Sequence, residues 1–160
     1  MPAAEGGRIR YAPVMPGCLF CRIVSADEAA HTVFEDDDVL AFLDHRPLFL
    51  GHTLVVPRGH HETLADLPSE AVRPLFRGAR LLSRAVEEAM GAEGSFVAIN
   101  NKVSQSVPHL HIHVVPRKKG DGLRGFFWPR QRYDGPEAMA ETQQRVRAVV
   151  QRLRADEVLA

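Results

Sequence analysis

The residues of this chain that most clearly point to chemistry are three histidines in alternation, His109, His111 and His113. On an extended strand, successive side chains point to opposite faces, so these imidazoles should share one face while Leu110 and Ile112 face a core. Three interpretations fit this spacing: a polar strand face, a metal site built from imidazoles, and nucleophilic catalysis in which one imidazole attacks phosphorus. The spacing favours catalysis and leaves metal binding open.

The two cysteines of the chain, Cys18 and Cys21, form a Cys-x₂-Cys pair. Such a pair can be half of a tetrahedral zinc site, a redox pair, or two small apolar side chains in a core. A zinc site would need two further ligands from elsewhere in the chain. The pair alone does not choose among these three interpretations.

Composition sets broad limits on the class of protein. The chain has 160 residues, 45% of them apolar, which suits one domain whose core needs no disulfides. Lys plus Arg and Asp plus Glu each number 20, and this balance argues against a broad nucleic-acid-binding face. The sequence shows no signal peptide and no apolar run of membrane-spanning length. We therefore expect a cytoplasmic protein with no nucleic-acid partner and no membrane partner.

Apolar periodicity predicts the elements that must position these side chains. Short apolar or alternating runs predict five strands, at residues 31–35, 39–44, 52–57, 95–101 and 110–115. A helical period predicts two main helices, at 69–90 and about 136–159, and the apolar stripe of the first includes Val72 and Phe76. This order indicates an α+β fold, a mostly antiparallel five-stranded sheet with helices packed against it.

The domain organisation expected from the sequence is simple. Residues 1–16 predict a flexible N-terminal tail, and residues 17–160 a single domain. An aromatic segment at residues 125–130 contains the single tryptophan, Trp128. Three interpretations of that segment remain open: core packing under the last helix, a dimer surface, or a lid near the active site.

Residues 109–115 (HLHIHVV) resemble the His-φ-His-φ-His-φ-φ signature of the histidine-triad (HIT) family, in which φ is apolar. The resemblance extends to CLFCRIV (18–24), LAFLDHRPLFLGHTLVVPRGH (40–60), FVAIN (96–100) and QSVPHLHIHVVPR (105–117). It implies a HIT-like fold and a nucleotide-binding hydrolase that cleaves at the α-phosphate through a nucleotidyl-histidine intermediate. It also implies a purine nucleotide substrate of adenosine type, a homodimer, and no catalytic metal.

The resemblance gives individual residues their expected roles. His111 corresponds to the nucleophile, and His113 and His52 correspond to histidines that border the same phosphate. Ser106 corresponds to the hydroxyl that contacts the phosphate or protonates the leaving group. The residues that correspond to nucleotide contacts are Phe20, Phe42, Leu43, Asp44, Asn100 and Gln105. Among them Asp44 would accept from the ribose hydroxyls, while the apolar members would line a slot for the base.

One departure from the family concerns the loop before the triad. Relatives commonly have a glycine-rich loop there, whose backbone amides help to hold phosphate. This chain has Asn101-Lys102-Val103-Ser104 instead. Lys102 is the candidate to compensate.

Bacterial-type members of the family commonly hold a structural zinc through a Cys-x₂-Cys pair and two histidines. The matching positions are Cys18, Cys21, His60 and His109. His61 is adjacent to His60, but alignment through VVPRGH favours His60. His31 and His45 are expected at surface or turn positions.

The resemblance narrows the reaction without fixing the substrate. Histidine at the third triad position, His113, favours hydrolysis over the nucleotidyl transfer that accompanies glutamine there. Expected substrates are nucleoside phosphoramidates or dinucleoside polyphosphates, with release of a nucleoside monophosphate. A dinucleoside polyphosphate phosphorylase and a nucleotide-binding regulatory module with little turnover remain open, and a purely metal-binding protein is a distant third.

Overall fold

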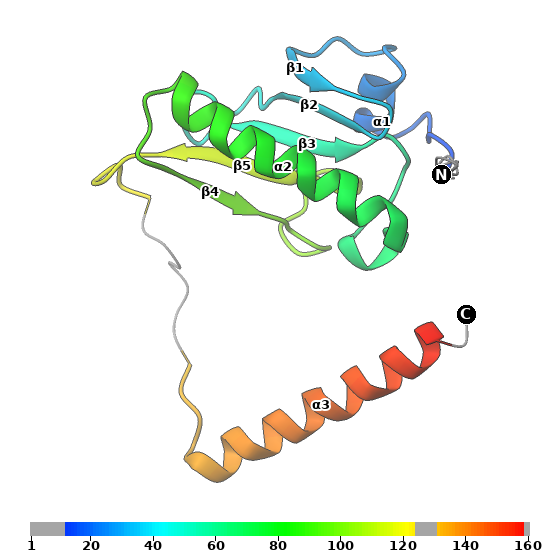
Figure 1. The fold of residues 1–160 in the computed structure, drawn as a ribbon, viewed down its shortest axis with the longest axis vertical. Helices are drawn as coiled ribbons and strands as arrows, with labels where there is room; N and C mark the ends of the chain where they lie inside the picture. The colour runs from blue at the N-terminus through cyan, green and yellow to red at the C-terminus, as the bar shows by residue number, and fades with distance from the viewer. Residues whose placement is uncertain (1–11, 124–130, 159–160) are drawn as a thin grey trace, which may run out of the picture. The chain divides into compact units, whose positions relative to one another are not determined.

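The computed structural model describes residues 12–123 and 131–158 (Figure 1). Residues 1–11 of the predicted tail and the aromatic segment at 125–130 lie outside the described residues. The chain divides into two compact units, Met1–Asp121 and Gly122–Ala160. The single domain predicted for residues 17–160 stays a prediction.

The first unit is built on a five-stranded antiparallel sheet, as the sequence predicted. Its strands are β1 (Thr32–Glu35), β2 (Val39–Leu43), β3 (Thr53–Pro57), β4 (Gly94–Ala98) and β5 (Ile112–Arg117). They are arranged in the order β1-β2-β3-β5-β4. Because β5 pairs with β3, the triad segment lies beside the segment that carries His52, although these two segments are far apart in sequence.

One face of the sheet is covered by helix α2 (Ser69–Ala89), which crosses it in Figure 1. The core on this side is apolar, and its fully buried members include Val39, Val55, Leu75, Leu110, Ile112 and Val114. Gly78 allows the close approach, since a Cβ there would lie 3.2 Å from a methyl carbon of Val39. Val72 and Phe76, which we placed in the buried stripe, are 37% and 42% exposed because they lie on the flank of the helix.

The opposite face of the sheet carries a second buried cluster and the functional side chains. Helix α1 (Leu19–Val24) packs there with Phe20 and Cys21 against Leu40, Phe42, Leu54 and Val56. Neither α1 nor the short 3₁₀ helix η1 (Leu64–Asp66) was predicted, because six and three residues are too short for a periodic signal. The sheet therefore separates a structural core under α2 from a second layer that contains Cys18 and Cys21.

The triad segment differs from the predicted strand 110–115 in one respect. Strand β5 begins at Ile112, so only His113 of the three histidines lies within it. The preceding amides are used locally: His109 N–H donates to Val107 O at 2.8 Å, and Leu110 N–H donates to His61 O at 2.6 Å. The alternation still holds, because Leu110, Ile112 and Val114 are all fully buried in the core under α2.

The second unit contains helix α3 (Pro136–Val158), close to the predicted 136–159. Its apolar residues Met139, Val146, Val149, Val150 and Leu153 are exposed. Within the described residues, no helix is long and apolar enough to cross a membrane.

Candidate active site

His111 is buried, with 2% of the residue exposed, at the point where the triad segment enters β5. Its Nδ1 lies 2.7 Å from the main-chain oxygen of His109. A carbonyl can only accept, so Nδ1 carries the proton and Nε2 is left with a free lone pair. Burial lowers the pKa of His111 below its ordinary value, which keeps the imidazole neutral near pH 7. A neutral imidazole with a free nitrogen is a competent nucleophile.

A second chain of contacts fixes the proton positions on His52 and His113. Leu48 N–H donates to His52 Nδ1 at 3.2 Å, so the proton of the neutral His52 ring is on Nε2. That Nε2 lies 3.0 Å from His113 Nδ1 and donates to it. His113 Nδ1 is thus an acceptor, and the proton of its neutral ring is on Nε2. These two hydrogen bonds, from Leu48 to His52 and from His52 to His113, form a relay. The relay leaves His113 Nε2–H free to donate beside His111, whose ring centroid is 4.8 Å away from that of His113.

Burial also keeps both of these rings uncharged. It lowers the pKa of His52, partly offset by the nearby Asp44 carboxylate. It lowers the pKa of His113 to about 4, with His111 and His52 adding to the effect. Asp44 itself is held in place by its Oδ1, which accepts from Arg46 N–H at 2.8 Å. Its Oδ2 lies 3.6 Å from His52 Nδ1.

These groups open onto a cavity of about 660 Å³, within the range typical of small-molecule sites. Eight of the predicted site residues line it: Phe20, Phe42, Leu43, Asp44, His52, Ser106, His111 and His113. The walls are mainly apolar, and Phe20 meets Phe42 edge-on at a centroid distance of 5.4 Å. Polar and titratable groups converge on the His111 side of an apolar slot, an arrangement that suits a nucleotide.

The Gln105 side chain forms hydrogen bonds within the protein, on both sides of the loop before the triad. Gln105 Oε1 accepts from Lys102 N–H at 2.7 Å, and its Nε2 donates to Glu62 O at 2.7 Å. Neither Gln105 nor Asn100 is among the residues that line the cavity, so their nucleotide contacts stay predictions. Lys102 and Ser104 adopt φ angles of 66° and 58°, a left-handed backbone that glycine would take without strain.

Among the cavity-lining residues that were not predicted as site residues, three have titratable side chains: Glu28, His31 and His45. His31 and His45 are exposed, as expected, but they lie at the rim of the cavity. His45 Nδ1 lies 3.8 Å from Asp44 Oδ1. Its position directly after Asp44 was the available signal for it, whereas nothing in the spacing pointed to His31.

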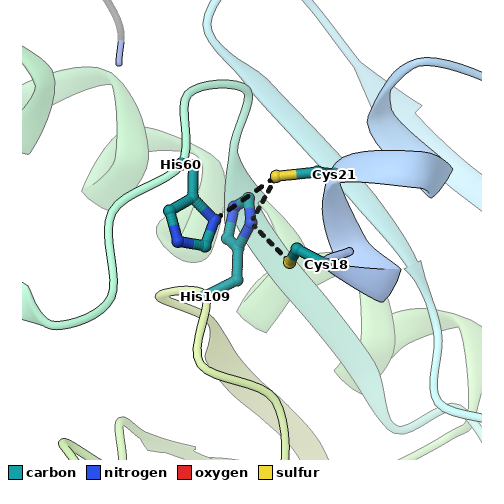
Figure 2. Close-up of side chains that lie close together, drawn as sticks. All are labelled: Cys18, Cys21, His60 and His109. Carbon is teal, nitrogen blue, oxygen red and sulfur yellow. Dashed lines mark hydrogen bonds between the residues drawn. The ribbon is translucent and has the colours of Figure 1, made fainter. Parts of the chain in front are cut away.

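The four predicted metal ligands converge between α1, the end of β3 and the triad segment (Figure 2). Cys18 Sγ and Cys21 Sγ lie 3.6 and 3.5 Å from His109 Nδ1, and Cys21 Sγ lies 3.3 Å from His60 Nδ1. A tetrahedral zinc with bonds of about 2.3 Å to sulfur and about 2.0–2.1 Å to nitrogen requires S···N separations of about 3.5 Å. His109 Nε2 donates to Pro57 O at 3.0 Å, which leaves Nδ1 as the ligand atom. The donor set and its geometry fit zinc.

The HIT domain family matches residues 25–120 of the chain. This protein belongs to the HIT family. The matched range contains the histidine triad, His52 and His60, but begins after Cys18 and Cys21.

Relatives of this HIT protein come from all three domains of life. An uncharacterised HIT-like protein of Methanocaldococcus jannaschii is 37% identical over 126 residues, which cover 78% of this chain and 97% of the relative. The Protein hit of Bacillus subtilis is 39% identical over 114 residues, covering 69% and 78%. A HINT-type adenylylsulfatase of Arabidopsis thaliana is 33% identical over 119 residues, which are 73% of this chain and 60% of the plant protein.

Solved structures share the fold of this HIT protein. A HIT family member from Bacillus subtilis superposes with a TM-score of 0.76 at 32% identity, covering 82% of this chain and 96% of that one. A zinc-bound histidine-triad protein from Mycobacterium smegmatis gives a TM-score of 0.64 at 38% identity, covering 80% and 96%. The predicted HIT-like fold is thereby confirmed.

The low pKa of His113 predicts an acid-sensitive fold. The unfolded chain, with an ordinary histidine pKa of about 6.5, binds a proton before the folded protein does as the pH falls. Because the folded pKa is about 4, stability is lost between these two values. We expect wild type to lose about 1–2 kcal/mol more than His113→Asn between about pH 7 and pH 4.5, a figure reduced for partial exposure of the ring. Urea unfolding at the two pH values measures this, and equal losses would contradict it.

Proposed function

We propose that this HIT protein is a nucleotidyl hydrolase that releases a nucleoside monophosphate, AMP from adenosine-type substrates. His111 Nε2 attacks the α-phosphorus, the bond to the leaving group breaks, and the nucleotide remains bonded to His111. Water then attacks the same phosphorus, the P–N bond breaks, and the nucleoside monophosphate leaves. The observation that carries this proposal is the 2.7 Å contact of His111 Nδ1 with the His109 carbonyl, because it makes Nε2 the nucleophilic nitrogen.

In this proposal, other residues of the cavity contact the phosphate, the ribose and the base of the substrate. His113 Nε2–H donates to a phosphate oxygen as negative charge shifts there, with His52 holding its tautomer. Ser106 lines the same cavity and supplies a hydroxyl for the phosphate or for the departing group. Asp44 accepts from the ribose hydroxyls, and the base occupies the slot of Phe20, Phe42 and Leu43. Asn100 and Gln105 remain proposed nucleotide contacts.

We also propose that Cys18, Cys21, His60 and His109 hold one structural zinc. Two thiolates and two imidazoles at tetrahedral spacing support zinc over the redox and inert-thiol interpretations of the pair. The zinc-bound Mycobacterium smegmatis protein supports the same assignment. When bound, the ion would link α1 to the triad segment. A homodimer and a cytoplasmic location are parts of the same proposal that await measurement.

The test of the proposed reaction is AMP release from three substrate classes by wild type and His111→Ala. The substrates are an adenosine phosphoramidate, a diadenosine polyphosphate and adenylyl sulfate, the last because the plant relative is an adenylylsulfatase. In ¹⁸O-labelled water, hydrolysis places one ¹⁸O in AMP. In the presence of phosphate, a phosphorylase would produce ADP instead. Nucleotide binding without release from any substrate would replace the hydrolase with the binding module.

Asp44 gives a separate prediction about the ribose. Replacing Asp44 with alanine should raise KM for a ribonucleotide substrate about 10- to 100-fold, because hydrogen bonds to a charged group are worth about 1.5–3 kcal/mol. The same change should have little effect on a 2′,3′-dideoxy substrate, which has no hydroxyls to offer. Steady-state kinetics of both proteins on both substrates measure the difference. An equal rise in KM for the two substrates would assign Asp44 to the turn at Arg46 instead.

A further inference from the structure

Cys18, Cys21, His60 and His109 form the cysteine–histidine cluster. His109 joins this cluster to the proposed nucleophile, because its ring belongs to the cluster and its main-chain carbonyl contacts His111. Its ring is completely buried, with Nδ1 3.6 and 3.5 Å from the two sulfurs and Nε2 bonded to Pro57 O. Its main-chain oxygen is the acceptor for His111 Nδ1–H at 2.7 Å. The residue whose ring belongs to the cluster is therefore also the residue whose carbonyl selects the tautomer of His111.

Phe20 forms a second connection between the same two sites. It lies in α1, between the N-cap residue Cys18 and Cys21. Its buried ring meets His111 edge-on at a centroid distance of 5.2 Å and an interplanar angle of 88°. The same ring is 6.0 Å from the ring of His109. Because Cys18 and Cys21 flank the dipeptide Leu19-Phe20, the chain on both sides of Phe20 belongs to the cluster.

From these contacts we infer that the cluster, with its metal bound, positions the nucleophile: Cys18, Cys21 and His60 act through His109 and Phe20 to hold His111 with Nδ1 protonated. Loss of the metal leaves the His109 ring held through Nε2 by Pro57 O alone, lengthens the His111 Nδ1–carbonyl contact and admits the tautomer whose Nε2 has no lone pair. Only the catalytic consequence of this inference depends on the proposed function. The state of the His111 ring does not.

His60 is the residue at which the inference is best tested. It is a cluster member that does not line the cavity, and its ring contacts His109 at a centroid distance of 5.2 Å. His60→Ala removes a ligand, whereas His60→Cys supplies a thiolate in its place. Glu62→Ala is the matched control, since Glu62 lies in the same loop with an exposed side chain.

Three readouts are needed on each variant: zinc content, kcat and KM, and ¹⁵N NMR of histidine rings, with the His111 signals assigned by their loss in His111→Gln. For His60→Ala we expect loss of zinc, loss of the Nδ1–H signature of His111, and a fall in kcat of about 10- to 100-fold that exceeds any rise in KM caused by movement of Phe20. His60→Cys should restore all three, and Glu62→Ala should match wild type. All measurements are made at temperatures below the unfolding transition of each protein, and circular dichroism is used to locate that transition.

The outcomes separate the inference from the proposed function. Zinc loss with an unchanged His111 signature and kcat would show that the cluster only fastens the fold, and would overturn the inference. If His60→Ala retains zinc with water as the fourth ligand, the test moves to wild type from which zinc has been removed by a chelator. Its His111 signature and kcat are then compared before and after zinc is restored. If wild type turns over no substrate, the proposed function fails, and the NMR signature alone decides the inference.

Discussion

Replacing His111 with alanine is expected to lower AMP release by roughly 10,000-fold or more, since removal of a covalent nucleophile leaves only binding and electrostatic contributions. The ring occupies a buried site with one fixed tautomer, and no second nucleophile stands in an equivalent place among the described residues that line the cavity. AMP affinity should change by no more than about threefold, because the Asp44 and base-slot contacts remain. Single-turnover kinetics and calorimetric titration with AMP measure the two effects.

Two controls make the His111 prediction sharp. His111→Gly should recover part of its activity when imidazole is added, because the added ring can fill the vacated space and attack phosphorus itself. Leu81→Ala, at a half-exposed site on α2, should retain the wild-type rate. A His111→Ala protein that keeps a tenth of wild-type activity would place the nucleophile elsewhere and end the proposed mechanism.

The sheet and α2 were predictable because their signals are local. Residues 53–57 form a continuous buried run, and Leu75, Ala79, Leu82 and Val86 repeat at helical spacing. Helix α1 has no such signal, since six residues make less than two turns. It is fixed by contacts distant in sequence, from Phe20 to Phe42 and from the two cysteines to His109.

The residues that make up the candidate site could be predicted more fully than the hydrogen bonds that connect them. The resemblance supplied all four members of the cysteine–histidine cluster, and the structure brings them together. The hydrogen bond from His52 to His113 depends on the pairing of Leu54 in β3 with His113 in β5. Because α2 and β4 separate these strands along the chain, no hairpin turn sets their register in a way that the sequence reveals. The relay that protonates His113 on Nε2 therefore emerged only from the structure.

The loop between β4 and the triad shows a different limit of sequence reasoning. Residues 101–104 contain no glycine, yet Lys102 and Ser104 both adopt left-handed conformations. The Gln105 side chain stabilises this loop by bonding Lys102 N and Glu62 O. A non-glycine residue at positive φ is uncommon, so local propensity could not predict this geometry.

Replacing both Cys18 and Cys21 with serine is expected to remove the one proposed equivalent of zinc and to lower the free energy of unfolding by about 3–5 kcal/mol. A ligand that binds only the folded state, present at about 1,000 times its dissociation constant, contributes about 4 kcal/mol. For a chain of this size the corresponding fall in Tm is about 10–20 °C. Differential scanning calorimetry and elemental analysis of the purified proteins measure these effects.

A chelator separates the metal contribution from the cost of the substitution itself. Both cysteines are buried, at 8% and 1% exposure, so two serine hydroxyls in their place add a desolvation cost that has nothing to do with zinc. Chelation should lower the Tm of wild type towards that of the double variant and leave the double variant unchanged. A wild-type Tm that does not respond to complete zinc removal would mean that the cluster does not stabilise the fold through a metal. In that case the buried thiols would be ordinary core residues, and the positioning of His111 would have to come from the Pro57 and His109 contacts alone.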